Sequence, residues 1–404
     1  MPAGPWRCSP RPASRTAIAL TVVFTVALAT ACAMLAGAPS ALAQASAAPA
    51  TSDLKPKGKV RLLGVEVAPG TRKRLTWSGG AALEGFAVPV PVIVLNGKGP
   101  GPVLCLTAAL HGDELNGIEV VRRVIDDIDV EELNGAVIAL PIVNLQGFYR
   151  GTRYLPDRRD LNRYFPGNAR GSSATRLAHS LFTEVIRHCS ALVDLHTGSL
   201  NRTNLPQIRA DLRSPQVTRM AQAFGATVVL HNKGDRGSLR RAANDAGIPS
   251  VTFEMGEPMR LQPEQVEHGT KAVATLLYAL GMTRQRRYWG DPEPVYYASK
   301  WVRVDNGGIL FSDVALGERV SEGELLGVVT DPLTSRQYRI YAPASGRVLG
   351  MALNQVVLPG FAAYRIGTRT SGMSADGKDD GGSEEGVDGG EDEETAEDEA
   401  APRG

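Results

Sequence analysis

An unbroken apolar run at residues 103–110 constrains the fold of this chain more than any other segment. Gly-Pro-Gly-Pro introduces the run, and its length and composition predict a strand that is buried on both faces. Apolar residues at helical spacing follow it at Ile118, Val121, Ile125 and Ile128. A buried strand followed by an amphipathic helix is the repeating unit of a parallel sheet. This segment therefore predicts an α/β fold.

The same alternation continues along the chain. Further strands are expected at 92–95, 136–141, 191–196, 228–230 and 250–254, and further helices at 174–188, 238–246 and 263–280. We therefore predict a mostly parallel mixed sheet flanked by helices within residues 57–290. From Val295 onward, short strands separated by glycine turns replace the helices. This change predicts a small C-terminal all-β, barrel-like domain at residues 294–370.

Both ends of the chain lie outside these two domains. Three arginines precede an apolar stretch near the start, and Ala41-Leu42-Ala43 offers a small-residue cleavage site. Residues 1–43 are therefore interpreted as a signal peptide, followed by a linker at 44–56, and the protein is expected to be periplasmic or extracellular. An uncleaved membrane anchor and a lipoprotein modified at Cys32 remain the alternatives; after cleavage, no stable membrane association is expected.

Charge is divided unevenly along the chain. Residues 371–404 hold thirteen acidic and two basic residues and no aromatic residue, which is typical of a disordered tail. Residues 44–370 hold 39 basic and 30 acidic residues, a balance that fits an anionic substrate. No basic helix or aromatic-rich basic run is present, so nucleic acid is not an expected partner. The oligomeric state is left open.

Two cysteines, Cys105 and Cys189, remain after the signal peptide is removed. One lies in the first core strand and the other ends a helix. We expect both to be buried free thiols.

Two histidines end expected strands. His111 follows the run at 103–110, with Glu114 three residues later, and His196 ends the strand at 191–196. Open α/β sheets bind ligands at the carboxyl ends of their strands, so these side chains can meet in one crevice. Two histidines and a carboxylate suit Zn²⁺ and leave it an open coordination position. His179, His188 and His268 fall on expected helices and are interpreted as structural, whereas His231, at a strand end, is left open.

Other residues supply the chemistry that a zinc hydrolase needs. Glu254 ends the strand at 250–254, where a buried carboxylate is costly unless it has a partner or a function, and it is the candidate general base. Glu257 is the nearest rival. The polar loop at 153–167 carries four arginines, whose guanidinium groups suit carboxylates, although a solvated surface loop would have the same composition.

Four motifs in this order resemble the succinylglutamate desuccinylase/aspartoacylase family: His-Gly-Asp-Glu-x-Asn-Gly, Asp-Leu-Asn-Arg-x-Phe-Pro-Gly, Asp-Leu-His-Thr-Gly and Phe-Glu-Met-Gly. Members of this family are zinc deacylases of the carboxypeptidase A fold, and the resemblance covers about residues 60–370. It implies one zinc ion per chain, held by His111, Glu114 and His196, with Glu254 as general base and acid.

The resemblance also implies roles for four residues of the polar loop. Asn162 and Arg163 match the pair that holds a substrate carboxylate, and Arg153 resembles the arginine that polarises the scissile carbonyl. Asp160 resembles the carboxylate that orients His111. The C-terminal domain matches the family's extra β domain, which partly covers the active site.

The sequence is therefore interpreted as that of a zinc-dependent deacylase acting on a small carboxylate-bearing substrate, such as an N-acyl amino acid. A metallocarboxypeptidase or amidase acting on cell-envelope peptides is one alternative. A non-catalytic binding protein on a hydrolase scaffold is the second, although the intact ligand set and Glu254 argue against it.

Overall fold

The computed structural model describes residues 60–79, 89–284, 296–353 and 355–369, which all belong to one compact unit spanning Ala47–Gly404. The expected signal peptide, linker and acidic tail lie outside these residues and stay predictions. Among the helices of the described segments, none is long and apolar enough to cross a membrane.

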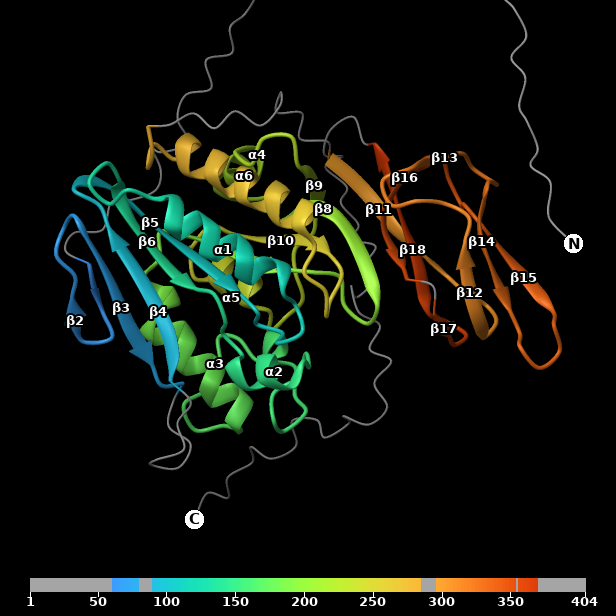
Figure 1. Ribbon diagram of the computed structural model, residues 1–404, viewed down its shortest axis with the longest axis horizontal. Helices are drawn as coiled ribbons and strands as arrows, with labels where there is room; N and C mark the ends of the chain where they lie inside the picture. Colours follow the sequence, from blue (N-terminus) through green and yellow to red (C-terminus); the bar gives the residue numbers. More distant parts are fainter. Residues whose placement is uncertain (1–59, 80–88, 285–295, 354, 370–404) are drawn as a thin grey trace, which may run out of the picture. The chain divides into compact units, whose positions relative to one another are not determined.

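The largest sheet is mixed and runs in the order β13-β16-β18-β11-β9-β8-β10-β7-β5-β6-β4-β3 (Figure 1). Its first eight strands along the sequence are β3 (Thr71–Trp77), β4 (Val90–Asn96), β5 (Gly99–Ala108), β6 (Asn134–Leu140), β7 (Ala191–His196), β8 (Arg202–Ala210), β9 (Val228–His231) and β10 (Ser250–Gly256). At the centre, β6, β5, β7 and β10 run parallel. The flanking strands β4 and β8 run antiparallel to β6 and β10. A mixed α/β sheet was expected from the sequence and is confirmed. A separate hairpin joins β1 (Arg61–Leu62) to β2 (Val65–Glu66).

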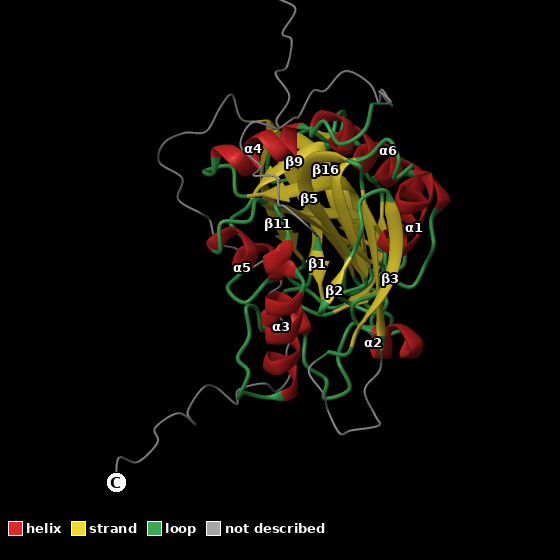
Figure 2. Cartoon of the chain, turned by 90° about the vertical axis from the view of Figure 1, so that its left-hand side faces the viewer, coloured by secondary structure: helices red, strands yellow, loops and turns green. Residues whose placement is uncertain are grey.

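Helices cover both faces of the large sheet (Figure 2). They are α1 (Asn116–Asp127), α2 (Leu145–Arg150), α3 (Ser173–Glu184), α4 (Pro215–Gln222), α5 (Leu239–Asp245) and α6 (Pro263–Ala279), with 3-10 turns η2 (Leu161–Arg163) and η3 (Ile186–His188). Residues of α1, α4 and α6 share one buried apolar cluster, and residues of α3 and α5 share another. Serines at 172, 214 and 238 cap α3, α4 and α5, since each side chain accepts a hydrogen bond from the first helical turn.

The sequence patterns did not predict β8 or α4. Strand β8 contains arginines, an asparagine, a glutamine and Pro206, so it lacks the apolar alternation that predicts a strand. It is nevertheless largely buried, because β10 and β9 pair with its edges. This segment is therefore a strand because its neighbours pair with it, and not because of its own residue pattern.

The C-terminal segment is all-β, as expected. Its strands are β11 (Tyr296–Arg303), β12 (Gly308–Ser312), β13 (Arg319–Val320), β14 (Leu325–Thr330), β15 (Gln337–Tyr341), β16 (Gly346–Ala352), β17 (Val356–Val357) and β18 (Ala362–Arg369). Strands β15, β14, β12 and β17 form a second sheet, whereas β11, β13, β16 and β18 extend the large one. The two sheets enclose their own apolar core, which includes Leu310, Leu326 and Tyr364. Barrel-like closure stays a prediction.

The expectation of two free thiols was wrong. Cys105 in β5 and Cys189, just after η3, form a buried disulfide with a Cα–Cα distance of 5.7 Å. Strand β7 begins two residues after Cys189 and pairs in parallel with β5, so Cys105 lies opposite Leu192. This pairing brings together two cysteines separated by 84 residues, and neither local pattern contains that information.

Candidate active site

The first sequence motif forms a tight turn between β5 and α1. Gly112 is required here, because a Cβ atom at this position would lie 2.0 Å from the carbonyl carbon of Gly147 in α2. The turn is closed by a hydrogen bond from the Glu114 amide to the His111 carbonyl. At the start of α1, the Asn116 side chain donates to the Met255 carbonyl and accepts from the Gln262 amide. These contacts fix His111 and Glu114 relative to β10.

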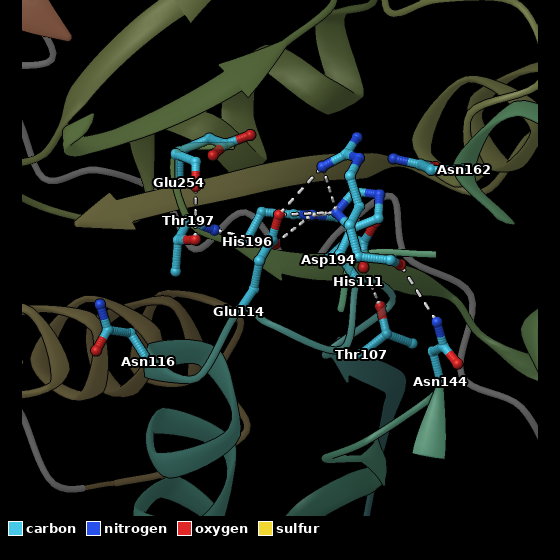
Figure 3. Close-up of polar contacts among 12 residues, drawn as sticks. Thr107, His111, Glu114, Asn116, Asn144, Asn162, Asp194, His196, Thr197 and Glu254 are labelled. Atoms are coloured by element: carbon cyan, nitrogen blue, oxygen red, sulfur yellow. Dashed lines mark hydrogen bonds and ion pairs between the residues drawn. The ribbon is translucent and has the colours of Figure 1, made fainter. Parts of the chain in front are cut away.

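His111, Glu114 and His196 form one buried cluster at the carboxyl ends of β5 and β7 (Figure 3). The Nδ1 atom of His111 lies 2.8 Å from Glu114 Oε1, and the Nδ1 atom of His196 lies 2.9 Å from Glu114 Oε2. The two Nδ1 atoms are 3.2 Å apart. Three potential ligand atoms therefore face a common point.

Carboxylates hold the other side of each imidazole ring. His111 Nε2 lies 3.1 Å from Asp160 Oδ1, and His196 Nε2 lies 2.8 Å from Asp194 Oδ2. The Thr107 hydroxyl in turn donates to Asp194. A proton on each Nε2 leaves both Nδ1 lone pairs aimed at the cluster centre. Two lone pairs and a carboxylate that converge in this way repel one another unless a cation lies between them, so the residues fit a metal ion.

The pKa values at this cluster reflect its charges. Burial alone would raise the pKa of Asp160, but His111 and Arg153 hold it well below its usual value. Burial would likewise raise the pKa of Glu114, which the two histidines instead lower. Burial would lower the pKa of His111 and His196, but the neighbouring carboxylates raise it, so opposite charges stabilise one another across the cluster.

Arg153 lies against the cluster. Its Nη2 atom is 2.9 Å from Asp160 Oδ2, and its Nη1 atom is 3.1 Å from His111 Nδ1. Asp160 thus contacts both His111 and Arg153, and it also caps η2 by accepting the Asn162 amide hydrogen. Both loop residues therefore lie beside His111.

Asn162 and Arg163 lie at the edge of the same site. The Asn162 side-chain oxygen accepts a hydrogen bond from the Leu239 amide at the start of α5, and its nitrogen points toward the cluster (Figure 3). Arg163 is 27% exposed, and its guanidinium lies 4.0 Å from Asp160 and 3.9 Å from Asp235. Part of the Arg163 side chain is therefore accessible to an anion.

Glu254 faces the cluster from β10, opposite Asn162 (Figure 3). It lies beside His196 in the parallel pairing of β10 with β7. Asn204 and Arg209 of β8 contact its two oxygens, at 3.2 Å and 3.3 Å. The rival Glu257 instead pairs with Arg260.

A cleft of about 670 Å³, partly open to solvent, connects these groups. Five arginines contribute to its lining: Arg153, Arg163, Arg202, Arg209 and Arg240. Trp301 of β11 also lines it, with the Arg202 guanidinium 5.3 Å from the centre of its indole ring. The sequence did not predict a role for Asn204, Arg202, Arg209, Arg240 or Trp301. The residues of β8 carried no local signal, because this segment lacks the apolar alternation of a strand.

Two of the remaining histidines have structural contacts. His231 accepts a hydrogen bond from the Leu212 amide. His268 contacts the Thr227 hydroxyl at 3.1 Å, and burial lowers its pKa to about 4.

The chain is similar in sequence to proteins of known activity. The model of the succinylglutamate desuccinylase/aspartoacylase catalytic domain matches residues 100–280. The N-alpha-acetyl-L-2,4-diaminobutyric acid deacetylase of Halomonas elongata is 29% identical over 258 residues, which cover 61% of this chain and 75% of that protein. The succinylglutamate desuccinylase of Pseudomonas aeruginosa is 28% identical over 221 residues, covering 50% of this chain and 61% of that protein.

A similar fold is found in a solved structure. The succinylglutamate desuccinylase/aspartoacylase from Rhodobacter sphaeroides superposes with a TM-score of 0.64 at 26% identity, covering 71% of this chain and 91% of the other.

Proposed function

Because the chain belongs to the succinylglutamate desuccinylase/aspartoacylase family, we propose that it is a zinc-dependent deacylase. The proposed reaction is hydrolysis of an amide bond in a small carboxylate-bearing substrate, such as an N-acyl amino acid. The activities of the Halomonas and Pseudomonas relatives, a deacetylase and a desuccinylase, support this class of reaction.

The observation that carries the proposal is the buried His111–Glu114–His196 cluster, which faces Glu254 across an arginine-lined cleft. Two imidazoles and one carboxylate would hold one zinc ion per chain and leave a coordination position open. Asp160 and Asp194 would orient the two imidazoles toward it.

Bound zinc would lower the pKa of a water molecule and polarise the scissile carbonyl. Glu254 accepts a proton from the attacking water and returns it to the leaving nitrogen as the C–N bond breaks. Arg153 donates hydrogen bonds toward the carbonyl oxygen as negative charge develops there. Asn162 and Arg163 hold the substrate carboxylate at the edge of the cleft.

We also propose that the protein acts outside the cytoplasm. The basic and apolar leader at residues 1–43 supports export. The Cys105–Cys189 disulfide is a second support, since disulfides persist mainly in oxidising compartments.

The first experiment is a substrate screen of the mature protein with added Zn²⁺. N-acetyl and N-succinyl amino acids, envelope-type peptides and esters should be compared at equal concentration. Preferential release of an amine from N-acyl amino acids would support the proposal. Turnover of peptides alone would favour the carboxypeptidase alternative, and binding without turnover would favour a non-catalytic protein.

The second experiment compares Glu254→Gln with the matched variant Glu257→Gln. Glu254→Gln should lower turnover by roughly 10²–10⁴, the usual contribution of a positioned general base, with zinc content unchanged. Glu257→Gln should retain most of the activity, because Glu257 pairs with Arg260. Full turnover in Glu254→Gln would remove this residue from the mechanism, and loss of zinc would identify it as a ligand.

A further inference from the structure

We propose that Arg209 is a positioning residue, which acts on the reaction through Glu254 and not through contact with substrate. The inference rests on the proposed function of Glu254 as the proton acceptor. Its basis is the geometry of β8, the strand that lies beside β10 and reaches both oxygens of the Glu254 carboxylate.

The register of the two strands places Arg209 on the cleft face. In the antiparallel pairing, Thr252 lies opposite Arg209, and Glu254 lies opposite Gln207. Residues that face each other across an antiparallel pair project to the same side of the sheet, and diagonal neighbours lie within reach of long side chains. Arg209 therefore reaches diagonally from its place beside Thr252, and its Nη1 atom lies 3.3 Å from Glu254 Oε1.

A β-bulge brings the second donor to the same face. Between the pairs Glu254–Gln207 and Gly256–Asn204, β8 contains one residue more than β10. The additional residue shifts the alternation of β8, so that Asn204 projects to the cleft side like Arg209. Its Nδ2 atom donates to Glu254 Oε2 at 3.2 Å. Pro206 lies within the irregular stretch, where the missing backbone donor is tolerated.

Each oxygen of Glu254 thus has its own donor from one rigid strand. A general base must hold its oxygen within hydrogen-bond reach of the proton it accepts, and misplacement by about 1 Å can cost about 10² in rate. The Arg209 and Glu254 side chains are only 11% and 8% exposed, so solvent competes little for this contact. Arg209 fixes the orientation of the carboxylate that faces the cluster.

The other arginines of the cleft have different partners. Arg240 donates to the Asn232 carbonyl, Arg202 donates to the Ala362 carbonyl, and Arg153 pairs with Asp160. Arg163, at 27% exposure, remains the accessible contact for a substrate anion. Arg209 is thus the cleft arginine that pairs with Glu254, whereas Arg163 is the one proposed to bind the substrate carboxylate.

The test is a double-mutant cycle on the full mature enzyme. Arg209→Met and Arg209→Lys are made in the wild type and in Glu254→Gln, and kcat, KM, zinc content and melting temperature are measured. Arg209→Met should lower kcat by about 10² with KM changed less than about threefold, and Arg209→Lys should recover most of kcat. In the Glu254→Gln background, Arg209→Met should change kcat by less than about twofold, because the carboxylate that Arg209 positions is absent.

Arg213→Met is the matched control. Arg213 follows β8 and pairs with Asp211 at the surface, where its side chain is 49% exposed. The Arg213→Met variant should retain the kcat and KM of the wild type. If Arg209→Met fails to fold, Asn204→Ala tests the same geometry, with an expected fall in kcat of about tenfold and no fall in Glu254→Gln.

The outcomes distinguish this inference from the proposed function. Unchanged kcat in Arg209→Met, a rise in KM alone, or an undiminished effect in Glu254→Gln would each overturn the positioning role. Full turnover in Glu254→Gln would instead overturn the role proposed for Glu254 itself. A loss of kcat in Glu254→Gln with none in Arg209→Met would leave the proposed function standing and remove only Arg209.

Discussion

Loss of the Cys105–Cys189 disulfide is expected to lower the stability of the fold substantially. The bond closes a loop over a sequence separation of 84 residues. In the chain-entropy account, freeing a loop of this length in the denatured state costs about 4.5 kcal/mol at 25 °C. The bond also joins β5 to Cys189, two residues before the start of β7, and these strands lead to His111 and His196. Its loss should therefore destabilise the part of the sheet that carries the cluster.

Equilibrium unfolding in urea, with and without dithiothreitol, measures this contribution without any substitution. With a slope of about 3 kcal/mol/M, the midpoint should fall by about 1.5 M when the bond is reduced in the denatured state. Cys105→Ala, Cys189→Ala and the double variant provide a second measurement. Either single variant removes the bond, so the double variant should be far less destabilised than the sum of the two single variants.

Thiol titration gives the decisive control. Oxidised protein unfolded without reductant should show no free thiol from this pair. Two reactive thiols per mature chain, together with equal urea midpoints with and without dithiothreitol, would show that the bond is absent and that the loop argument does not apply.

Three further predictions follow from the site and from the composition of the chain. Purified mature protein should carry about one zinc per chain by elemental analysis, and His111→Ala/His196→Ala almost none; equal zinc in both would disprove the ligand assignment. Arg163→Ala should raise KM for anionic substrates by about 10–100-fold with a smaller change in kcat, and an unchanged KM would place the carboxylate elsewhere. Deleting residues 372–404 should leave melting temperature and turnover unchanged, since their composition offers little apolar surface to pack; a loss of several degrees would mean that this acidic segment binds the basic body.

The central strands and the His111–Glu114–His196 cluster were predictable from the sequence, because both depend on local patterns. Apolar runs of strand length marked β5 and β7, and each run ended on a histidine. Since parallel strands end at the same edge of a sheet, the ends of these runs already indicated that His111 and His196 would meet. Glu114 followed from its fixed spacing to His111. Only the assumption that β5 and β7 are neighbours needed the structure.

The disulfide was not predictable in the same way. Each cysteine lies in an apolar environment that suits a free thiol equally well. A disulfide forms here and not two free thiols because β5 pairs with β7. This pairing places the Cα atoms of Cys105 and Cys189 5.7 Å apart. A pattern along one segment carries no information about the distance to another.

Strand β8 shows the same principle at the proposed general base. A buried glutamate requires partners or a function, and this rule made Glu254 a candidate without indicating which residues its partners are. Asn204 can serve because its other side faces β16, where Gly350 lies opposite it in the pairing. A Cβ atom on Gly350 would lie 2.7 Å from Asn204 Oδ1, so a larger residue there would displace the side chain that donates to Glu254. The environment of the proposed base thus depends on a glycine in the C-terminal strands, far away along the chain. Neither β8 nor β16 has a sequence pattern that indicates this dependence. It arises because the two strands pair in the fold.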